Sequence, residues 1–357
     1  MREILGFTFE KRENRSRLWQ VSTTLMAIIV ALLIAAVLIS FAGADVGRAF
    51  AGLYGGAFGS WKSILETLVK STPLMLTGLA VTVAFRGRIW NIGAEGQFWA
   101  GAMAGYWASV TFSFLPPAAH FIVMLLSAFI GGAICGLIPG LLKGLLNVDE
   151  TIVSVMMNYV IHFFLSFMLS GPWQAPGEYF YMTAKIPESA QFPVLGNSRL
   201  HVGFIVGLVA AVIVFWLLQK SRLGYNIRAM GLNPTAAKFK GINVARVIIV
   251  TLLISGGIAG LAGVGEVAGI NHRLRADSSS GYGFLGIIVA MLGGLNPIGV
   301  IIAAIFFGAL INGSNRMQIY TGVPIALVYA MQAIILLSLL AFQVLANYRI
   351  RRIKDVE

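Results

Sequence analysis

Apolar runs of about twenty residues recur along almost the whole chain, and they limit its possible folds more than any other feature. A helix of that length crosses the roughly 30 Å hydrocarbon core of a bilayer. Hydrophobic residues make up 58% of the 357 residues and charged residues only 11%, well below the roughly 25% of a soluble domain. Since spanning segments must satisfy their own backbone groups, the sequence predicts an all-α polytopic membrane protein, with 1–357 as a single transmembrane domain.

Hydropathy places ten candidate spans, and two of them are unusually short. The segments 284–295 and 299–313 have only about twelve and fifteen residues, so we expect half-helices or a re-entrant pair. Whether 284–313 spans twice or re-enters stays open, and counting both segments as spans or neither leaves the topology of the rest unchanged. We therefore predict a bundle of about 8–10 transmembrane helices with interrupted helices. The candidate spans are 22–41, 64–85, 93–112, 119–142, 150–170, 202–219, 247–267, 284–295, 299–313 and 324–345.

The net charge of +12 comes from basic residues that lie mostly on one side of these spans. With the N-terminus inside, 18 of the 26 Lys and Arg residues lie in cytoplasmic segments, as the positive-inside rule requires. The pattern predicts a cytoplasmic N-tail (1–21), loop (220–246) and C-tail (346–357). The charge therefore reports topology and indicates no nucleic-acid partner. The single cysteine, Cys135, and four scattered histidines indicate no metal site.

The stretch RGRIWNIGAEGQFWAG, residues 86–101, places polar side chains between two predicted spans. Asn91, Glu95 and Gln97 supply hydrogen-bonding groups there, and polar residues at membrane depth are candidates for a substrate path. Alternatively, Asn91 and Glu95 cap the span that follows, since a carboxylate is favourable at a helix N-terminus. Both roles remain open at this point.

Other polar residues within or near the spans also have two interpretations each. Glu66 precedes Lys70 by four residues, which suits either an internal pair or a substrate contact. Asn158 lies in the middle of the fifth predicted span and either bonds to another helix or lines a path. Arg86 and Arg88 mark the cytoplasmic side or pair with Glu95.

The segment GLNPTAAKFKGI predicts a short helix within the 220–246 loop. Asn233 is a good N-cap, and Pro234 suits the first helical position. The helix would cover 235–240 and end at Gly241, which readily adopts the left-handed conformation. It is either an ordinary connector or a docking helix for a cytoplasmic partner.

Four motifs in order along the chain are similar to one family of transport proteins. NIGAEGQ (91–97), DETIVSVMMNY (149–159), GLNPTAAKFKGI (231–242) and GFLGIIVAMLGGLNPIG (283–299) resemble ABC importer permeases of the nucleoside and simple-sugar branch, within the branched-chain amino acid and ribose-type permease superfamily. The resemblance covers most of the chain from about 80 to 315. Thr235 stands where the coupling loop of other importer branches has a glutamate.

The resemblance implies a permease subunit in the bacterial inner membrane that forms a path for nucleosides by alternating access, or alternatively for simple sugars. The implied partners are cytoplasmic ABC ATPase subunits, a second permease subunit, identical or different, and an extracytoplasmic substrate-binding protein. No GxxxxGK[ST] motif occurs, so a partner would bind the ATP and this chain needs no cofactor. The coupling residues implied by the motif are Gly231, Asn233, Pro234, Ala236, Ala237, Lys240 and Gly241.

Two other classes of function fit the sequence less well. A transporter driven by an ion gradient would be expected to carry acidic groups deep in several spans, and it would leave the predicted docking helix without a role. An intramembrane enzyme would need a metal set, a Ser/His pair or an acidic dyad at one depth, and the sequence suggests none of these.

Overall fold

A computed structural model describes residues 2–4, 7–11, 17–196, 198–275, 281–324, part of 326–342, and 348–352. Contacts divide the chain into two units. One is Ser60–Ile311, and the other combines Met1–Gly59 with Asn312–Glu357. The prediction of one domain over 1–357 stays a prediction.

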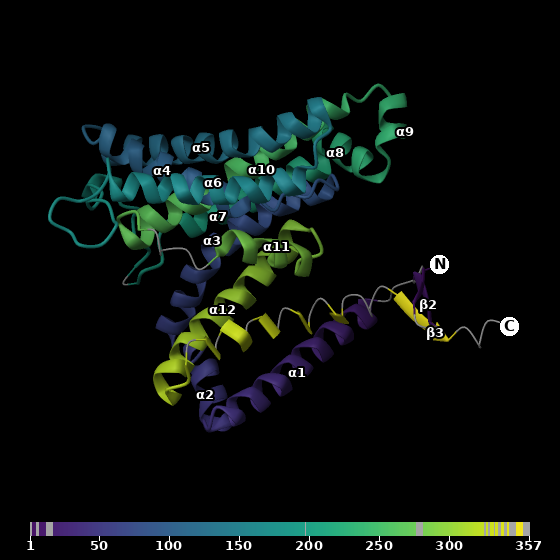
Figure 1. Cartoon of the computed structure of the whole chain (residues 1–357). Coiled ribbons are helices and arrows are strands. Elements are labelled where there is room, and N and C mark those ends of the chain that lie inside the picture. The colour runs from purple at the N-terminus through teal and green to yellow at the C-terminus, as the bar shows by residue number, and fades with distance from the viewer. Residues whose placement is uncertain are drawn as a thin grey trace. The chain divides into compact units, whose positions relative to one another are not determined.

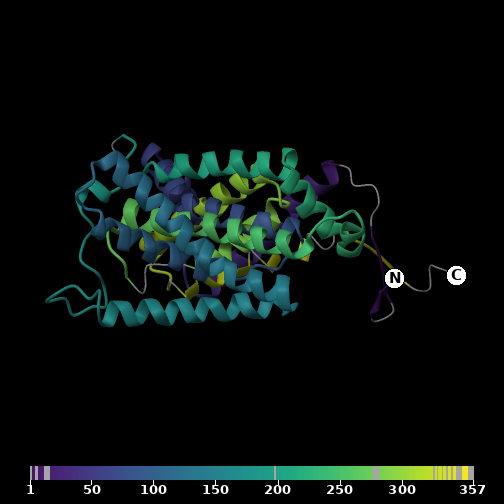
Figure 2. The ribbon, with the colours of Figure 1, turned by 90° about the horizontal axis from the view of Figure 1, so that it is seen from above.

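The unit Ser60–Ile311 is a helical bundle (Figure 1). The helices α6 and α7 lie along opposite sides of it (Figure 2). The short helices α8 and α9 lie at one end, and the 171–201 loop lies at the other (Figure 1). The helices are α3 (Trp61–Arg86), α4 (Ala94–Thr111), α5 (Pro117–Leu146), α6 (Glu150–Ser170), α7 (Gly203–Lys220), α8 (Arg222–Leu232), α9 (Pro234–Phe239), α10 (Val244–Glu266), α11 (Tyr282–Leu292) and the first part of α12 (Pro297–Thr321), with a 3₁₀ turn at Glu188–Ala190 and a π turn at Val267–Asn271.

Small residues allow α5 and α10 to pack backbone against backbone. A Cβ added at Gly132 would meet the carbonyl oxygen of Gly256, and one at Gly260 would meet the Cα of Gly132 at 3.1 Å. Further along, a Cβ at Gly144 would lie 2.9 Å from the carbonyl oxygen of Ala245. Small residues at four-residue spacing permit such close approach in membrane bundles, so the two ridges of small residues in these helices face each other.

The interruption between the two predicted segments is confirmed, but only the first of them is a short helix. The helix α11 has only 11 residues, about 16 Å at 1.5 Å per residue. The helix α12 continues for 25 residues to Thr321, well past the predicted end at 313. Polar residues end the apolar run there, but Asn312 donates to the carbonyl of Gly56 at 2.8 Å, and this contact supports a helix that hydropathy alone ends early.

The described residues of the second unit include the helices α1 and α2, the end of α12 and a small sheet. The helix α1 (Arg17–Phe41) leads to α2 (Val46–Ala57), which was not predicted from the sequence. Asp45 caps α2. Small residues of α2 pack closely against α12, since a Cβ added at Gly52 would lie 3.0 Å from the Cα of Met317. The antiparallel strands β1 (Arg2–Ile4), β2 (Phe7–Lys11) and β3 (Tyr348–Arg352) pair in the order β1-β2-β3.

The predicted class of polytopic helical membrane protein is confirmed. Among the described residues, six helices are long and apolar enough to cross a bilayer: α3, α5, α6, α7, α10 with its π turn, and α12. The strands found among these residues lie in the terminal tails. The predicted span 324–345 lies partly outside the described residues, and those described between 326 and 342 are helical. The cytoplasmic placement of both termini stays a prediction.

Candidate functional site

The polar stretch 86–97 forms a bend between α3 and α4, and one face of α6 holds its backbone. Glu150 Oε1 accepts a hydrogen bond from the backbone N–H of Trp90 at 3.3 Å. One turn later, Ser154 Oγ accepts from the N–H of Ile92 at 3.2 Å. Together with Asn158 these residues follow the i, i+4, i+8 spacing of one helix face, and all three are buried. Only Asn158 was predicted from the sequence, although the spacing of the three residues is visible there.

Asn158 bonds to the bend with both ends of its amide. Its Oδ1 accepts from the N–H of Gly96 at 2.7 Å, and its Nδ2 donates to the carbonyl oxygen of Ile92 at 3.0 Å. The N–H of Gly96 belongs to the first turn of α4, whose donors have no partner inside the helix. In this structure Asn158 therefore connects α6 to the bend and to the start of α4 by hydrogen bonds. Its contact with a substrate stays a prediction.

Asn91 and Gln97 form a reciprocal amide pair inside the bend. Asn91 Nδ2 donates to Gln97 Oε1 at 2.9 Å, and Gln97 Nε2 donates to Asn91 Oδ1 at 3.0 Å. The same Asn91 amide donates to Ser255 Oγ at 2.9 Å and accepts from the N–H of Gly93 at 3.1 Å. Ser255 in turn donates to the carbonyl of Ala80. Buried polar groups that satisfy one another in this way rigidify a bundle, so the pair joins α4 to α10 and α3.

Glu95 bonds to the start of the half-helix α11 rather than capping its own helix. Its Oε2 accepts from the N–H of Gly283 at 2.7 Å, and its Oε1 accepts from Trp99 Nε1 at 3.2 Å. A carboxylate is favourable at a helix N-terminus, and a Cβ added at Gly283 would meet the backbone of Glu95. Thr77 Oγ1 donates to the carbonyl of Tyr282 at 2.9 Å, so the broken helix is held on two sides.

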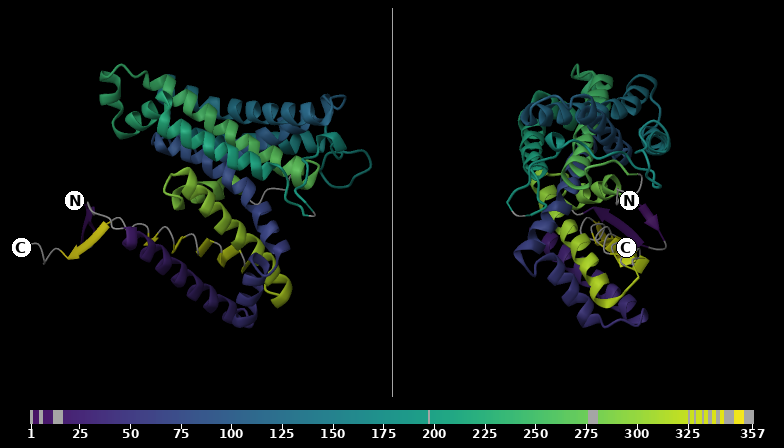
Figure 3. Two further views of the ribbon diagram at one scale, coloured as in Figure 1. Left: turned by 180° about the vertical axis from the view of Figure 1, so that it is seen from behind. Right: turned by 90° about the vertical axis from the view of Figure 1, so that its left-hand side faces the viewer.

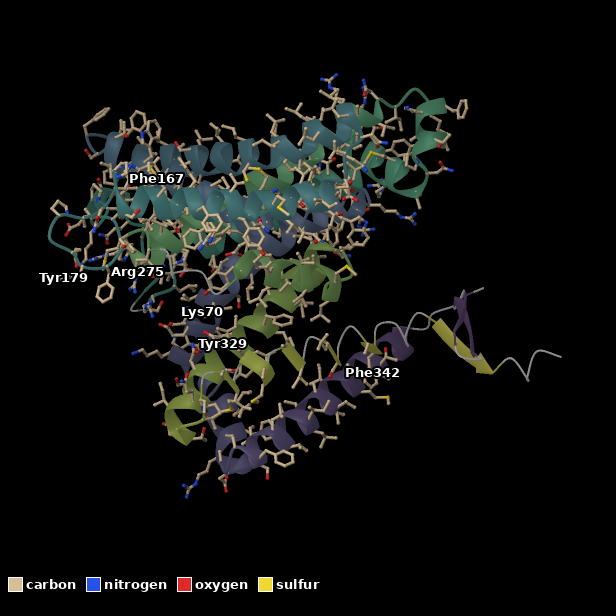
Figure 4. All side chains as sticks on the ribbon, in the orientation of Figure 1. Lys70, Phe167, Tyr179, Arg275, Tyr329 and Phe342 are labelled. Atoms are coloured by element: carbon tan, nitrogen blue, oxygen red, sulfur yellow. The ribbon has the colours of Figure 1, made fainter. Side chains whose placement is uncertain are left out.

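Glu66 lies elsewhere, near the end of the bundle that carries the 171–201 loop. Its carboxylate pairs with Arg199 of that loop at 3.7 Å. Lys70, four residues later, lies 3.5 Å from the hydroxyl of Tyr282. Figure 4 shows Lys70 on α3, with Tyr179 and Arg275 at this same end. The structure therefore brings together Asn91, Glu95, Gln97 and Asn158 and leaves Glu66 apart from them.

The 171–201 loop packs on the segment that follows α10. The N–H of Ile186 donates to the carbonyl of His272 at 2.9 Å, and the N–H of Thr183 donates to Leu274 at 3.1 Å. His201 is buried, and its Nδ1 accepts from the N–H of Gly203 at 3.1 Å. Burial lowers the pKa of His201 to about 4, with a contribution from the nearby His272.

The predicted docking helix is present as α9, shifted by one residue. Asn233 Oδ1 accepts from the N–H of Ala236 at 3.1 Å, and Pro234 is the first helical residue. Lys240 follows the helix as its C-cap instead of lying inside it, and Gly241 has a φ of 78°. The helix α8 was not predicted from the sequence, and its N-cap Ser221 accepts from the N–H of Gly224 at 3.0 Å.

The end of α8 touches the bend directly. A Cβ at Gly231 would lie 2.6 Å from the carbonyl oxygen of Arg86 and 3.0 Å from the carbonyl carbon of Gly87. Gly231, which was expected to flank a loop, is therefore a point of backbone contact. Ala237 of α9 is buried in one hydrophobic cluster with Ile89 and other residues around the bend. The predicted coupling segment and the polar stretch are thus joined by packing.

Among the described residues, no three His, Cys, Asp or Glu side chains come together as metal ligands would. The site consists of amides, hydroxyls and two carboxylates around a broken helix. Its chemistry is hydrogen bonding.

The sequence matches the family model described as branched-chain amino acid transport system, permease component, over residues 63–340. It is 37% identical to the guanosine ABC transporter permease protein of Bacillus subtilis, over 94% of this chain and 96% of that protein. It is 32% identical to the glucose ABC transporter permease protein of Haloferax volcanii, over 92% and 89% of the two chains. It is 33% identical to a nucleoside ABC transporter permease protein of Lactococcus lactis subsp. cremoris, over 90% and 91%. The chain therefore belongs to the permease family of branched-chain amino acid transport systems: it is a multi-pass membrane permease of an ABC transporter, a transport component with ATPase partners rather than an enzyme.

Proposed function

We propose that the chain forms the translocation path for nucleosides in an ATP-driven importer of the bacterial inner membrane. The observation that carries this proposal is the 37% identity to a guanosine permease protein over nearly the full length of both chains. The similarity to a second nucleoside permease protein supports it. Alternating access, driven by the ATPase partners, would move the substrate.

A simple sugar is the second candidate substrate. The glucose permease protein of Haloferax volcanii is 32% identical over 92% of the chain, so the sugar alternative rests on a full-length relative too. Nucleosides and sugars are both neutral and rich in hydroxyl groups, and the hydrogen-bonding groups around the bend suit either class. A transport assay is needed to distinguish the two classes of substrate.

We propose α9 and its flanks as the surface where the ATPase engages. One side of α9 is anchored, since Ala237 is buried among the residues around the bend. On the other side, Phe239 is 89% exposed, a large apolar side chain free to enter a partner. Because Gly231 contacts the backbone at Arg86 and Gly87, a movement of α8 and α9 would reach the bend directly. The proposed coupling residues are Gly231, Asn233, Pro234, Ala236, Ala237, Lys240 and Gly241.

The proposed path residues divide into two roles. Asn91, Gln97 and Asn158 hold the bend in place, and any substrate contact they make would follow a rearrangement of their amide bonds. Glu95 links the bend to the half-helix α11, so we propose it as the joint that alternating access opens or closes. Glu66, paired with Arg199, would contribute at the end where substrate enters.

The remaining parts of the assembly follow from the family resemblance. We propose a second permease subunit, identical or different, and an extracytoplasmic binding protein that delivers substrate to the end bearing the 171–201 loop. On this arrangement α8, α9 and both chain termini face the cytoplasm, in agreement with the distribution of Lys and Arg along the sequence.

The first test measures uptake of labelled guanosine by cells with and without this gene, with unlabelled glucose and ribose as competitors. Guanosine uptake that is lost on deletion and ignores both sugars supports the proposal. Unchanged guanosine uptake together with lost sugar uptake would mean that the permease transports sugars, as the second candidate states.

The second test concerns the docking surface. In a Cys135→Ala background, a cysteine replacing Lys238 in α9 should cross-link to a cysteine on the ATPase. The matched control replaces Tyr179, which is 99% exposed at the opposite end of the bundle, and it should give no cross-link. Equal cross-linking at both positions, or none anywhere along 233–241, would reject α9 as the docking site.

A further inference from the structure

We infer that a cationic pocket beside the end of α8 binds the phosphate group of an anionic phospholipid. The pocket has a volume of about 460 Å³, within the range of roughly 300–1,000 Å³ typical of small-molecule sites. Arg86, Arg88 and Arg228 all line it, together with Trp90. The three arginines come from two separate parts of the chain, the bend and α8, and they converge on one space.

The charge of the pocket is not balanced by the residues that line it. No acidic side chain is among them, and the nearby Glu150 is engaged by Lys143 at 2.9 Å and by the backbone of the bend. Arg228 Nη1 is buried without a hydrogen-bond partner. A buried cationic donor without a partner is costly in free energy. An external anion would supply the hydrogen-bond acceptor and the negative charge that the residues lining the pocket lack.

The arginine geometry suits a phosphate. Arg86 donates from Nε to the carbonyl of Leu295 at 2.8 Å, which fixes the plane of its guanidinium and leaves the terminal nitrogens for a ligand. Planar guanidinium groups bind phosphate oxygens bidentately. Arg88 has a φ of 54°, a left-handed conformation that is strained for a residue with a side chain. Strain of this kind is concentrated at ligand sites.

The walls of the pocket indicate a ligand with an apolar part. Leu232, Met291 and Leu295 line it beside the arginines, and Leu232 is 76% exposed. Beyond Leu295, the exposed side chains of Ile298 and Ile302 continue along one face of α12. A phospholipid combines a phosphate with chains that would follow this surface, whereas inorganic phosphate or a nucleotide would leave it uncovered.

The position of the pocket in the bundle fits a lipid headgroup. Its lining residues lie where α3 and α8 end and where α11 turns into α12. The helices α8 and α9 lie at one end of the unit Ser60–Ile311 (Figure 3). Basic pockets between transmembrane helices on the cytoplasmic side bind anionic headgroups, and Trp is enriched at the membrane interface. Because Gly231 also lines the pocket, the lipid would touch the contact between α8 and the bend.

The test uses the purified full-length chain in a neutral detergent, with soluble short-chain dihexanoyl phosphatidylglycerol as the probe. Binding is followed by native mass spectrometry and by the rise in melting temperature. Wild type should bind phosphatidylglycerol at least about tenfold more tightly than dihexanoyl phosphatidylcholine, and Arg228→Gln or Arg86→Gln should each weaken that binding about tenfold. Arg222→Gln, an exposed arginine of α8 outside the pocket, should bind as wild type does.

Folding and ligand source are tested separately. Arg228→Lys keeps the charge and should retain more binding than Arg228→Gln, and every variant is first checked for a single symmetric peak in size-exclusion chromatography. Should a Gln variant fail that check, Arg88→Gln, which removes the charge of an exposed arginine of the same pocket, carries the comparison, and unchanged binding in it would overturn the inference. Equal binding of phosphatidylcholine would also overturn it. Competition by inorganic phosphate at the concentration that phosphatidylglycerol needs would identify free phosphate as the ligand. If the ATPase raises the melting temperature and phosphatidylglycerol does not, the ligand of the pocket is a carboxylate of the ATPase, and the inference is overturned.

Discussion

Asn158→Ala tests whether the polar groups around the bend fasten the bundle or line the path. Asn158 bonds to the N–H of Gly96 and to the carbonyl of Ile92, and alanine reaches neither. Leaving a buried polar group unpaired costs about 1–3 kcal/mol. Hydrogen bonds between helices in membranes average only about 0.6 kcal/mol, since the unfolded reference finds other partners. We expect a loss of about 2–4 kcal/mol, because the two orphaned groups belong to a non-helical bend and the first turn of α4.

The loss of stability is measured as a fall in the melting temperature of the purified transporter in detergent. Size-exclusion chromatography is the readout of unfolding. Met156→Ala is the matched control, since Met156 lies on the same helix with its side chain 57% exposed, and it should change stability by less than about 0.5 kcal/mol. Asn158→Asp retains the acceptor for the N–H of Gly96, so its melting temperature should lie between those of Asn158→Ala and Met156→Ala. If Asn158→Ala melts like Met156→Ala while the KM for nucleoside uptake rises, the fastening role is refuted and Asn158 is a substrate contact.

Three further outcomes follow from the structure. Gly231→Ala places a Cβ 2.6 Å from the carbonyl of Arg86, so α8 must shift; the number of substrate molecules transported per ATP hydrolysed should fall, and an unchanged ratio would show that this contact carries no coupling. Gly260→Leu should prevent stable assembly, since α10 has no space there, whereas Gly265→Ala in the same helix, whose nearest neighbour atom lies 4.0 Å away, should melt as wild type does. Because the pKa of His201 is lowered from 6.5 to about 4, its contribution to stability is present above pH 6.5 and is lost as the pH falls toward 4, by about 3 kcal/mol at most. The melting temperature of wild type should drop over that window more steeply than that of His201→Asn, and parallel curves would contradict the assignment.

The helices whose apolar runs are uninterrupted could be predicted from the sequence, with ends off by a few residues. Hydropathy identifies them because the bilayer requires about twenty apolar residues in each. The capping of α9 was equally legible, since Asn233 and Pro234 act on neighbouring backbone groups. Elements that depend on other parts of the chain were missed. The helix α2 is short and stabilised by packing against α12, and the end of α12 is polar but bonded to α2.

The sequence also indicated several polar residues of the bend, but it missed Glu150 and Ser154 and left the roles of the others undecided. A list of Asn91, Glu95 and Gln97 is compatible with capping, with lining and with pairing, because each amide or carboxylate can take several partners. The tertiary structure decides among these roles by bringing Asn91 to Gln97 and Ser255, and Glu95 to Gly283, residues up to 188 positions away in the chain. Local patterns fix helices and caps because those contacts lie within one or two turns. The partners of a buried polar group are fixed only when the helices pack.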